Sequence, residues 1–205
     1  MSLFFIWANI TMKFLLLMLT RWEVVGRENI PKNGPLMVVS NHLSMVDPPL
    51  LGASIPRRII FMAKEELYGS WFSRTVVKQY GSFPIRRGKL DRKAIKQALL
   101  VLEHGNALGV FPEGTRSPNG RLQAAEAGAA LIAYRSNARI LPVGICGTDT
   151  IKGIHLFSNR PHITVTIGKP FTLPQSDGKR SRQKLGEYTD IIMTHIAELL
   201  PEKYR

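Results

Sequence analysis

The chain has 205 residues, enough for one globular domain that buries a sizeable core without disulfides or a structural metal. Its 28 lysines and arginines outnumber its 15 aspartates and glutamates, and the net charge of +13 indicates an anionic partner: nucleic acid, an anionic membrane surface or a phosphorylated substrate. The single cysteine, Cys146, excludes an internal disulfide and fits a reducing compartment.

Residues 1–20 form a hydrophobic segment, in which 14 of the 18 residues from Ser2 to Leu19 are apolar. Asn9 and Lys13 fall on one face of the expected helix, a pattern typical of a helix lying in one leaflet of a membrane. A full span needs about 20 apolar residues, so this run is slightly short. We expect a monotopic membrane anchor on the cytoplasmic face, with a single span as the second reading and a buried core helix as the third.

Residues 21–205 alternate short apolar runs with helical patterns, which predicts one α/β domain with a largely parallel mixed sheet flanked by helices. The expected strands are 35–41, 57–63, 81–86, 107–112, 139–146 and 162–168, and the clearest expected helices are 90–104, 124–136 and 181–200. Ahead of the last helix, the basic stretch 176–184 is a candidate contact for anionic lipid headgroups.

Ligands of open α/β sheets bind beyond the carboxyl ends of the strands, so the residues that follow each strand are the candidates for a site. His42 follows the first apolar run, and Asp47 lies five positions later, at the start of the next expected helix. A carboxylate there can orient the imidazole and support its cation, which would make His42 a general base. Taken alone, a surface histidine beside a helix-capping aspartate explains the same pattern.

Three more strand ends carry unusual residues. Arg86 ends a short strand and can clamp a phosphate with its planar guanidinium, although exposed arginines at such positions are common. The turn Glu113, Gly114, Thr115 and Arg116 follows the strand 107–112 and combines close backbone approach with donors and positive charge. The strand 139–146 contains Pro142, for which we expect a structural or pocket-lining role.

The four blocks in this order resemble the glycerolipid acyltransferase family, which includes the 1-acyl-sn-glycerol-3-phosphate acyltransferases. The matching residues are Asn41-His42 with Asp47, the block 81–86, the sequence Phe-Pro-Glu-Gly-Thr-Arg-Ser at 111–117, and the proline-bearing run 141–144. The resemblance spans residues 35–146 by motif. After "RSPNGRLQ" many relatives continue with an aromatic residue and a lysine, whereas this chain has "AAEAG", with Ala125 and Glu126 near the expected site.

The resemblance implies transfer of a fatty acyl group from acyl-CoA or acyl carrier protein to the sn-2 hydroxyl of lysophosphatidic acid, with no other cofactor, no metal and no covalent acyl-enzyme. The resemblance implies that His42 deprotonates the acceptor hydroxyl and that Asp47 orients the imidazole of His42. The matching residues Arg86, Glu113, Gly114, Thr115 and Arg116 hold the acceptor phosphate, and Lys64 is a possible additional phosphate or CoA contact.

Several alternatives compete with this reading. Within the family, the acceptor could be another lyso-lipid or glycerol 3-phosphate. A nucleic-acid-binding module would explain the charge, but the sequence has no helix-turn-helix, zinc-ligand or paired-aromatic pattern, so we expect no nucleic-acid partner. A serine hydrolase using Ser44 or Ser117 lacks a Gly-x-Ser-x-Gly elbow. Cys146 follows an apolar run with no activating neighbour in sequence, so we expect a buried thiol and not a thioester-forming one.

Overall fold

The structure, a computed structural model, describes all residues except 1–2, 87–90, 152–159 and 175–181. Within the described chain, seven strands form one sheet in the order β1-β7-β6-β2-β5-β3-β4. The strands are β1 Arg21–Val25, β2 Leu36–Ser40, β3 Ile59–Lys64, β4 Phe83–Ile85, β5 Ala107–Val110, β6 Arg139–Cys146 and β7 His162–Ile167. Every neighbouring pair in this sheet is parallel except β6 and β7, so the predicted α/β fold with a largely parallel mixed sheet is confirmed.

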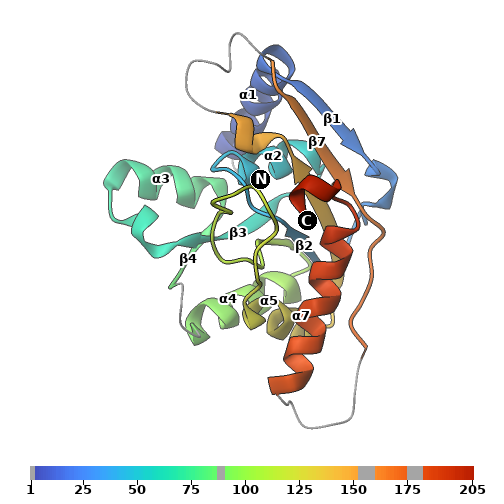
Figure 1. Ribbon diagram of the computed structural model, residues 1–205. Coiled ribbons are helices and arrows are strands. Elements are labelled where there is room, and N and C mark those ends of the chain that lie inside the picture. The colour runs from blue at the N-terminus through green and yellow to red at the C-terminus, as the bar shows by residue number, and fades with distance from the viewer. Residues whose placement is uncertain (1–2, 87–90, 152–159, 175–181) are drawn as a thin grey trace.

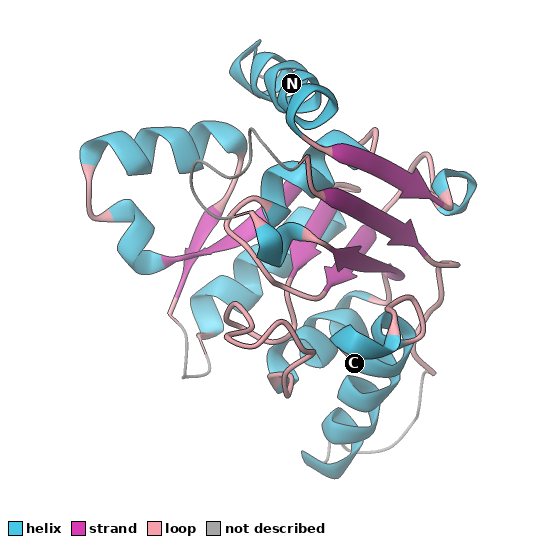
Figure 2. Cartoon of the chain, turned by 45° about the horizontal axis from the view of Figure 1, so that its top comes forward, coloured by secondary structure: helices cyan, strands magenta, loops and turns pink. Residues whose placement is uncertain are grey.

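Helices cover both faces of the sheet (Figures 1 and 2). One face carries α4 Arg92–Glu103, α5 Ala127–Ser136 and α7 Arg182–Ala197, and the other carries α1 Leu3–Leu19 and α2 Asp47–Ser54. The helix α3 Trp71–Tyr80 lies beside α1 near the β3–β4 end of the sheet. Short 3-10 helices occupy Arg27–Asn29, Glu65–Tyr68, Thr148–Thr150 and Glu202–Tyr204.

The central strand β2 shows why the sheet has helices on both sides. Met37 and Val39 join the core beneath α4, α5 and α7, whereas Leu36 and Val38 join the core beneath α1 and α2. All four side chains are completely buried. A parallel strand that is covered on both faces needs a continuous apolar run, and the sequence Leu-Met-Val-Val supplies it.

The predicted strands and helices agree with the structure apart from their ends and a few short elements. The expected strand 107–112 ends at Val110, because the backbone from Phe111 onward leaves the sheet and forms the site loop. Strand β1 was not predicted from the sequence; its alternating exposure is that of an edge strand, and in the described sheet it pairs with β7. Most of the basic stretch 176–184 lies outside the described residues.

The N-terminal helix α1 is partly buried and partly exposed. Leu16 packs into the core, and the Tyr80 hydroxyl donates a hydrogen bond to Asn9 Oδ1 at 3.2 Å, which explains a polar residue in an apolar helix. A Cβ at Gly52 of α2 would lie 2.2 Å from the Tyr80 hydroxyl, so this close packing requires glycine there. None of the described helices is both long and apolar enough to cross a membrane.

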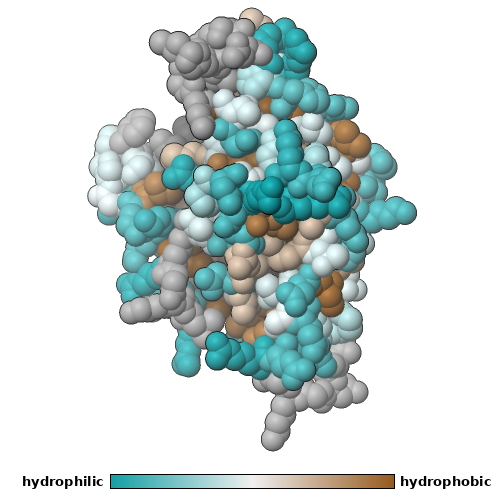
Figure 3. Space-filling model, in the orientation of Figure 1, coloured by the Kyte–Doolittle hydropathy of each residue, from teal (hydrophilic) through white to brown (hydrophobic). Residues whose placement is uncertain are grey.

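The opposite side of α1 leaves large apolar side chains in solvent. Trp7 is 73% exposed, and Ile10, Phe14 and Leu17 are each 61% exposed. We call Trp7, Ile10, Phe14, Leu17 and Met18 the α1 apolar face. The face of the molecule in Figure 3 is mostly hydrophilic, with hydrophobic areas confined to patches.

Candidate active site

The parallel strands bring the predicted site residues to one edge of the sheet. His42 follows β2, Lys64 ends β3, Arg86 follows β4 and the loop 111–117 follows β5. Because β2, β3, β4 and β5 are parallel neighbours, their carboxyl ends meet at the same edge. The topology therefore gathers segments that lie far apart in the chain: His42 and Glu113, for example, are 71 positions apart.

His42 and Asp47 form a buried hydrogen-bonded pair. His42 Nδ1 donates to Asp47 Oδ2 at 2.8 Å, and the side chains are 8% and 0% exposed. A carboxylate acceptor at Nδ1 fixes the neutral tautomer with its proton on Nδ1, which leaves the lone pair of Nε2 for a substrate proton. The pair that the motif predicts is thus formed and buried, and its role as a general base stays a prediction.

Three further donors hold the Asp47 carboxylate. The backbone N–H groups of Leu43 and Ser44 each donate to Oδ2 at 2.7 Å, and the Thr148 hydroxyl donates to Oδ1 at 2.7 Å. Asp47 is also the first residue of α2, where the helix dipole favours a negative charge. Pro48 follows it in the first turn, where the missing N–H costs nothing.

Thr148 was not predicted from the sequence; it lies in the turn after β6 and is 1% exposed. That turn is itself braced by the C-terminus of the chain. The Tyr204 hydroxyl accepts from Gly147 N and donates to Asp149 Oδ1, both at 3.0 Å. No local pattern in the sequence links Thr148 to a carboxylate 101 positions earlier.

The imidazole of His42 is held by its neighbours as well as by Asp47. Its ring stacks on Phe111, with centroids 4.1 Å apart and an angle of 19° between the planes. The preceding residue, Asn41, bridges β2 to β6, because its side chain donates to Ile145 O at 2.9 Å and accepts from Ile145 N at 2.8 Å. These contacts fix the position of the base before a substrate arrives.

Glu113 stabilises the site through the backbone. Its Oε1 accepts from His42 N at 2.8 Å and its Oε2 accepts from Gln123 N at 3.0 Å. Burial raises the pKa of Glu113 to about 7, the two backbone N–H donors oppose this rise, and the charge of Asp47 adds to it. Each oxygen of Glu113 already accepts one backbone N–H, and the direct contact with a phosphate stays a prediction.

The first of two cavities at this edge, which we call the apolar cavity, measures about 560 Å³ and lies between α1, α2, α3 and β3. His42 forms part of its wall, and Arg116 and Lys64 are the cations in its lining. The remaining lining is mainly apolar: Ala8, Met12, Met45, Pro48, Pro49, Phe61, Met62, Ala63, Leu67, Val77, Tyr80 and Phe111, with Ser73 and Ser82. A long apolar chain ending in an anionic group would fit this lining.

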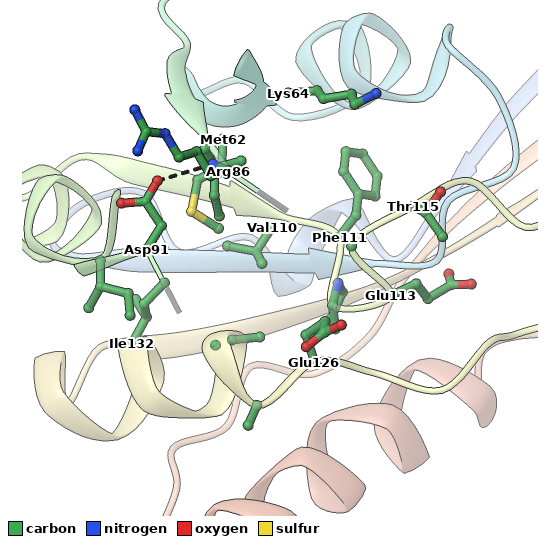
Figure 4. Close-up of a pocket in the computed structure, with 17 residues that line it drawn as sticks. Met62, Lys64, Arg86, Asp91, Val110, Phe111, Glu113, Thr115, Glu126 and Ile132 are labelled. Atoms are coloured by element: carbon green, nitrogen blue, oxygen red, sulfur yellow. Dashed lines mark hydrogen bonds between the residues drawn. The ribbon is translucent and has the colours of Figure 1, made fainter. Parts of the chain in front are cut away.

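The second cavity, which we call the mixed cavity, measures about 530 Å³ and is drawn in Figure 4. It shares Met62, Lys64 and Phe111 with the apolar cavity, so the two adjoin at the ends of β3 and β5. In Figure 4, Phe111, Thr115 and Glu113 lie toward one end, and Arg86 and Asp91 lie toward the other. His42 does not line the mixed cavity.

The predicted phosphate-binding residues therefore fall into two groups. Arg116 lines the apolar cavity beside His42, whereas Arg86, Gly114 and Thr115 line the mixed cavity. Lys64 lies between them and is paired with Glu66 at 3.0 Å on the surface. Pro142 lines neither cavity: it is buried in β6 opposite Val39, and its carbonyl accepts from Gly168 N at 2.9 Å.

The alternative nucleophiles find no support in this geometry. The Ser117 hydroxyl lies 2.6 Å from the Arg121 carbonyl oxygen, and Ser44 contacts the dyad through its backbone N–H. In the described chain neither serine hydroxyl forms a hydrogen bond to His42. Burial raises the pKa of the Cys146 thiol to about 11, with Lys203 opposing the rise, so the nucleophilic thiolate is scarce at neutral pH.

A family model described as "Acyltransferase" matches residues 21–146, which contain β1 to β6 and every predicted site residue. The chain belongs to this acyltransferase family. The family match agrees with the placement of His42, Asp47 and the loop 111–117 at one edge of the sheet.

Individual acyltransferases of this family support the same assignment. The 1-acyl-sn-glycerol-3-phosphate acyltransferase of Bacillus subtilis is 28% identical over 178 residues, which are 86% of this chain and 87% of that protein. The crystal structure of the 1-acyl-sn-glycerophosphate acyltransferase PlsC from Thermotoga maritima superimposes with a TM-score of 0.72 at 27% identity, covering 95% of this chain and 79% of that one. A lyso-ornithine lipid O-acyltransferase of Pseudomonas aeruginosa is 38% identical over 115 residues, which are 49% of this chain and 44% of that protein.

Proposed function

We propose that this acyltransferase transfers a fatty acyl group from a thioester donor, acyl-CoA or acyl carrier protein, to the sn-2 hydroxyl of 1-acyl-sn-glycerol 3-phosphate. The product would be phosphatidic acid, a precursor of phospholipids. The observation that carries this proposal is the position of His42, hydrogen-bonded to Asp47, in the wall of an apolar cavity that Arg116 also lines. The relatives from Bacillus subtilis and Thermotoga maritima bear names for the same reaction.

The chemistry follows from the tautomer of His42. Nε2 accepts the proton of the acceptor hydroxyl as the oxygen attacks the thioester carbonyl, and the C–O bond forms in a tetrahedral intermediate. The C–S bond then breaks, and the proton on Nε2 passes to the departing thiolate. Asp47 keeps Nδ1 protonated and stabilises the transient imidazolium. The acyl group passes directly to the acceptor, with no acyl-enzyme and no metal or cofactor apart from the donor.

The acceptor phosphate is assigned to the apolar cavity. The sn-2 hydroxyl and the phosphate of the acceptor are only a few bonds apart. When the hydroxyl meets His42, the phosphate therefore lies close to it, and we place it in the cavity that His42 lines. That cavity contains two cations, Arg116 and Lys64, and no carboxylate in its lining. The guanidinium of Arg116 can bind phosphate oxygens in a bidentate way, and Lys64 adds a point charge.

We further propose that the protein is monotopic and binds the cytoplasmic face of a membrane through the α1 apolar face. Ala8 and Met12 of the same helix line the apolar cavity, so a helix lying at the membrane would place the cavity beside the lipid that supplies its substrate. The net charge of +13 favours anionic lipid surfaces. Nucleic acid plays no part in this assignment.

An acceptor with another headgroup is the second candidate, favoured by the 38% identity to the lyso-ornithine lipid O-acyltransferase. Mass spectrometry of the products decides between them when purified protein receives palmitoyl-CoA with an equimolar mixture of lysophosphatidic acid, lyso-ornithine lipid and glycerol 3-phosphate. Phosphatidic acid as the main product would support the proposal. A diacyl product of another acceptor would assign the site to that headgroup, and free palmitate alone would contradict an acyltransferase.

A further inference from the structure

We propose that the mixed cavity binds the phosphopantetheine arm that acyl-CoA and acyl carrier protein share, with its thiol end at Phe111 and its phosphate end at Arg86. This inference rests on the proposed function, in which the acceptor occupies the apolar cavity. The donor must then bring its thioester to His42 by a different route. The mixed cavity adjoins the apolar cavity along Met62, Lys64 and Phe111, so it offers that route.

Inside the mixed cavity the charges suit a neutral chain better than the doubly charged phosphate monoester of the acceptor, whereas the phosphate of the arm is a singly charged diester and would lie at the outer end. The cavity lining combines the cations Lys64 and Arg86 with three acids, Asp91, Glu113 and Glu126. Two of the acids serve the protein itself: Asp91 accepts from the backbone N–H groups of Arg86, Lys93 and Ala94, and Glu113 accepts from His42 and Gln123. A dianion in this lining would face carboxylates, whereas the apolar cavity presents none.

The polarity of the mixed cavity suits an arm that carries two amides on an aliphatic chain. Its apolar wall is formed by Met62, Ile85, Ile95, Val110 and Ile132. Polar groups come from Thr115 and from the first turn of α5, where Ala127, Gly128 and Ala129 line the cavity. The first N–H groups of a helix have no acceptor within the helix, so they can donate to amide carbonyls of the arm.

The outer end of the mixed cavity carries a cation that can meet the terminal phosphate. Arg86 is exposed and paired with Glu65 at 2.9 Å, and Figure 4 places it at the end opposite Phe111. An exposed ion pair contributes little, so Arg86 can exchange Glu65 for a phosphate at small cost. The nucleotide of CoA, or the carrier protein, would then lie outside the cavity, which would explain how one site accepts both donors.

Gly128 offers a direct test. Gly128 lines the cavity and a Cβ there meets no atom within 4 Å, so we expect the side chain in Gly128→Leu to narrow the cavity, and leucine is a better helix residue than glycine. Gly186 of α7 is an exposed helical glycine with equally open surroundings, so Gly186→Leu is the matched control. We expect Gly128→Leu to weaken binding of palmitoyl-CoA about tenfold or more in calorimetry without acceptor, and Gly186→Leu to leave it unchanged.

Steady-state kinetics with three different donors test whether the cavity recognises the arm or another part of the donor. With Gly128→Leu, the KM for palmitoyl-CoA and for palmitoyl-acyl carrier protein should both rise about tenfold, while the KM for lysophosphatidic acid stays within about twofold. Palmitoyl-N-acetylcysteamine lacks most of the arm, so its kcat/KM should not change. If only the CoA donor is affected, the cavity recognises the nucleotide and not the arm, and a raised KM for the acceptor or no effect at all would overturn the inference. Because the calorimetry needs no turnover, it tests this site even if the proposed acceptor is wrong.

Discussion

The hydroxyl of Thr148 donates a 2.7 Å hydrogen bond to Asp47 Oδ1, the carboxylate oxygen that His42 does not use. Thr148 lines neither the apolar nor the mixed cavity, so it acts as a positioning residue. It holds one oxygen of the Asp47 carboxylate while the other oxygen orients the imidazole of His42. Both groups are buried, and an unpaired polar group in that environment is costly.

We expect Thr148→Val to lower kcat about tenfold or more and to leave the KM of both substrates unchanged, because the dyad loses its alignment and not its binding surface. Steady-state kinetics test this, and Thr148→Ser should restore kcat because it keeps the hydroxyl. Thr150→Val is the matched control: Thr150 donates to Gly147 O in the same turn but does not contact Asp47. Equal losses in Thr148→Val and Thr150→Val would reduce Thr148 to a structural residue of the turn.

The separation of the two arginines predicts opposite kinetic effects. Arg116→Ala should raise the KM for lysophosphatidic acid about tenfold or more, because Arg116 lines the cavity that holds His42. Arg86→Ala should raise the KM for the acyl donor instead, because Arg86 lines only the mixed cavity. Initial rates with each substrate varied in turn measure both constants. A raised KM for lysophosphatidic acid in both variants would show that the two arginines bind the acceptor phosphate together, as the sequence first suggested.

The sequence was sufficient for the strands and helices whose apolar periodicity is strong. The buried run of β2, the helix α4 and the order of the four motif blocks all predicted structure that is present. The edge strand β1 was missed because an edge strand buries only alternate residues and carries a weak apolar signal. The division of the site into two cavities could not be predicted from the sequence either. Which cavity Arg86 or Arg116 lines depends on tertiary packing around Phe111.

Glu113 makes stability depend on pH in a definite direction. Burial raises its pKa to about 7 in the folded protein, above the ordinary value of 4.5. This contribution to stability is present below the ordinary value and is lost as the pH rises through about 7. Between pH 5 and 8, the wild type should therefore lose about 2–3 kcal/mol of unfolding free energy relative to Glu113→Gln, which cannot ionise.

Urea denaturation of both proteins across this pH range measures that difference. A difference that stays constant with pH would show that Glu113 titrates as an ordinary carboxyl. A difference of the opposite sign would show that the N–H groups of His42 and Gln123 stabilise the carboxylate more strongly than burial destabilises it.

The α1 apolar face predicts how the protein meets lipid. Deleting residues 1–20 would also uncover the core at Leu16 and break the Asn9–Tyr80 contact, so substitutions are the sharper test. We expect the double substitution Trp7→Glu and Phe14→Glu to lower binding to vesicles containing anionic phospholipid by about tenfold or more, because both side chains are largely exposed. Vesicle sedimentation measures this, with Val25→Glu on β1 as a control for an exposed apolar residue. Unchanged sedimentation of the double variant would show that another surface of the protein binds the membrane.

The site residues that could be predicted from the sequence belong to short motifs, whereas those that could not act through contacts between distant segments. His42 and Asp47 lie five positions apart, and their short spacing suggested a dyad that the structure contains. Thr148 and Tyr204 act on that dyad through contacts that span many residues, and a lone threonine or tyrosine carries no signal of such a role. Glu113 was recognised by its motif, but its role in binding backbone N–H groups could be read only from the structure.

The most direct test of histidine-based acyl transfer is thiol release from palmitoyl-CoA by purified protein, with and without lysophosphatidic acid, comparing wild type with His42→Ala and Asp47→Asn. We expect release that depends on the acceptor in the wild type and that falls by about 10² to 10⁴-fold in both variants, with folding unchanged by circular dichroism. Release that does not need the acceptor, or near-normal turnover in His42→Ala, would contradict a histidine-based acyl transfer at this site.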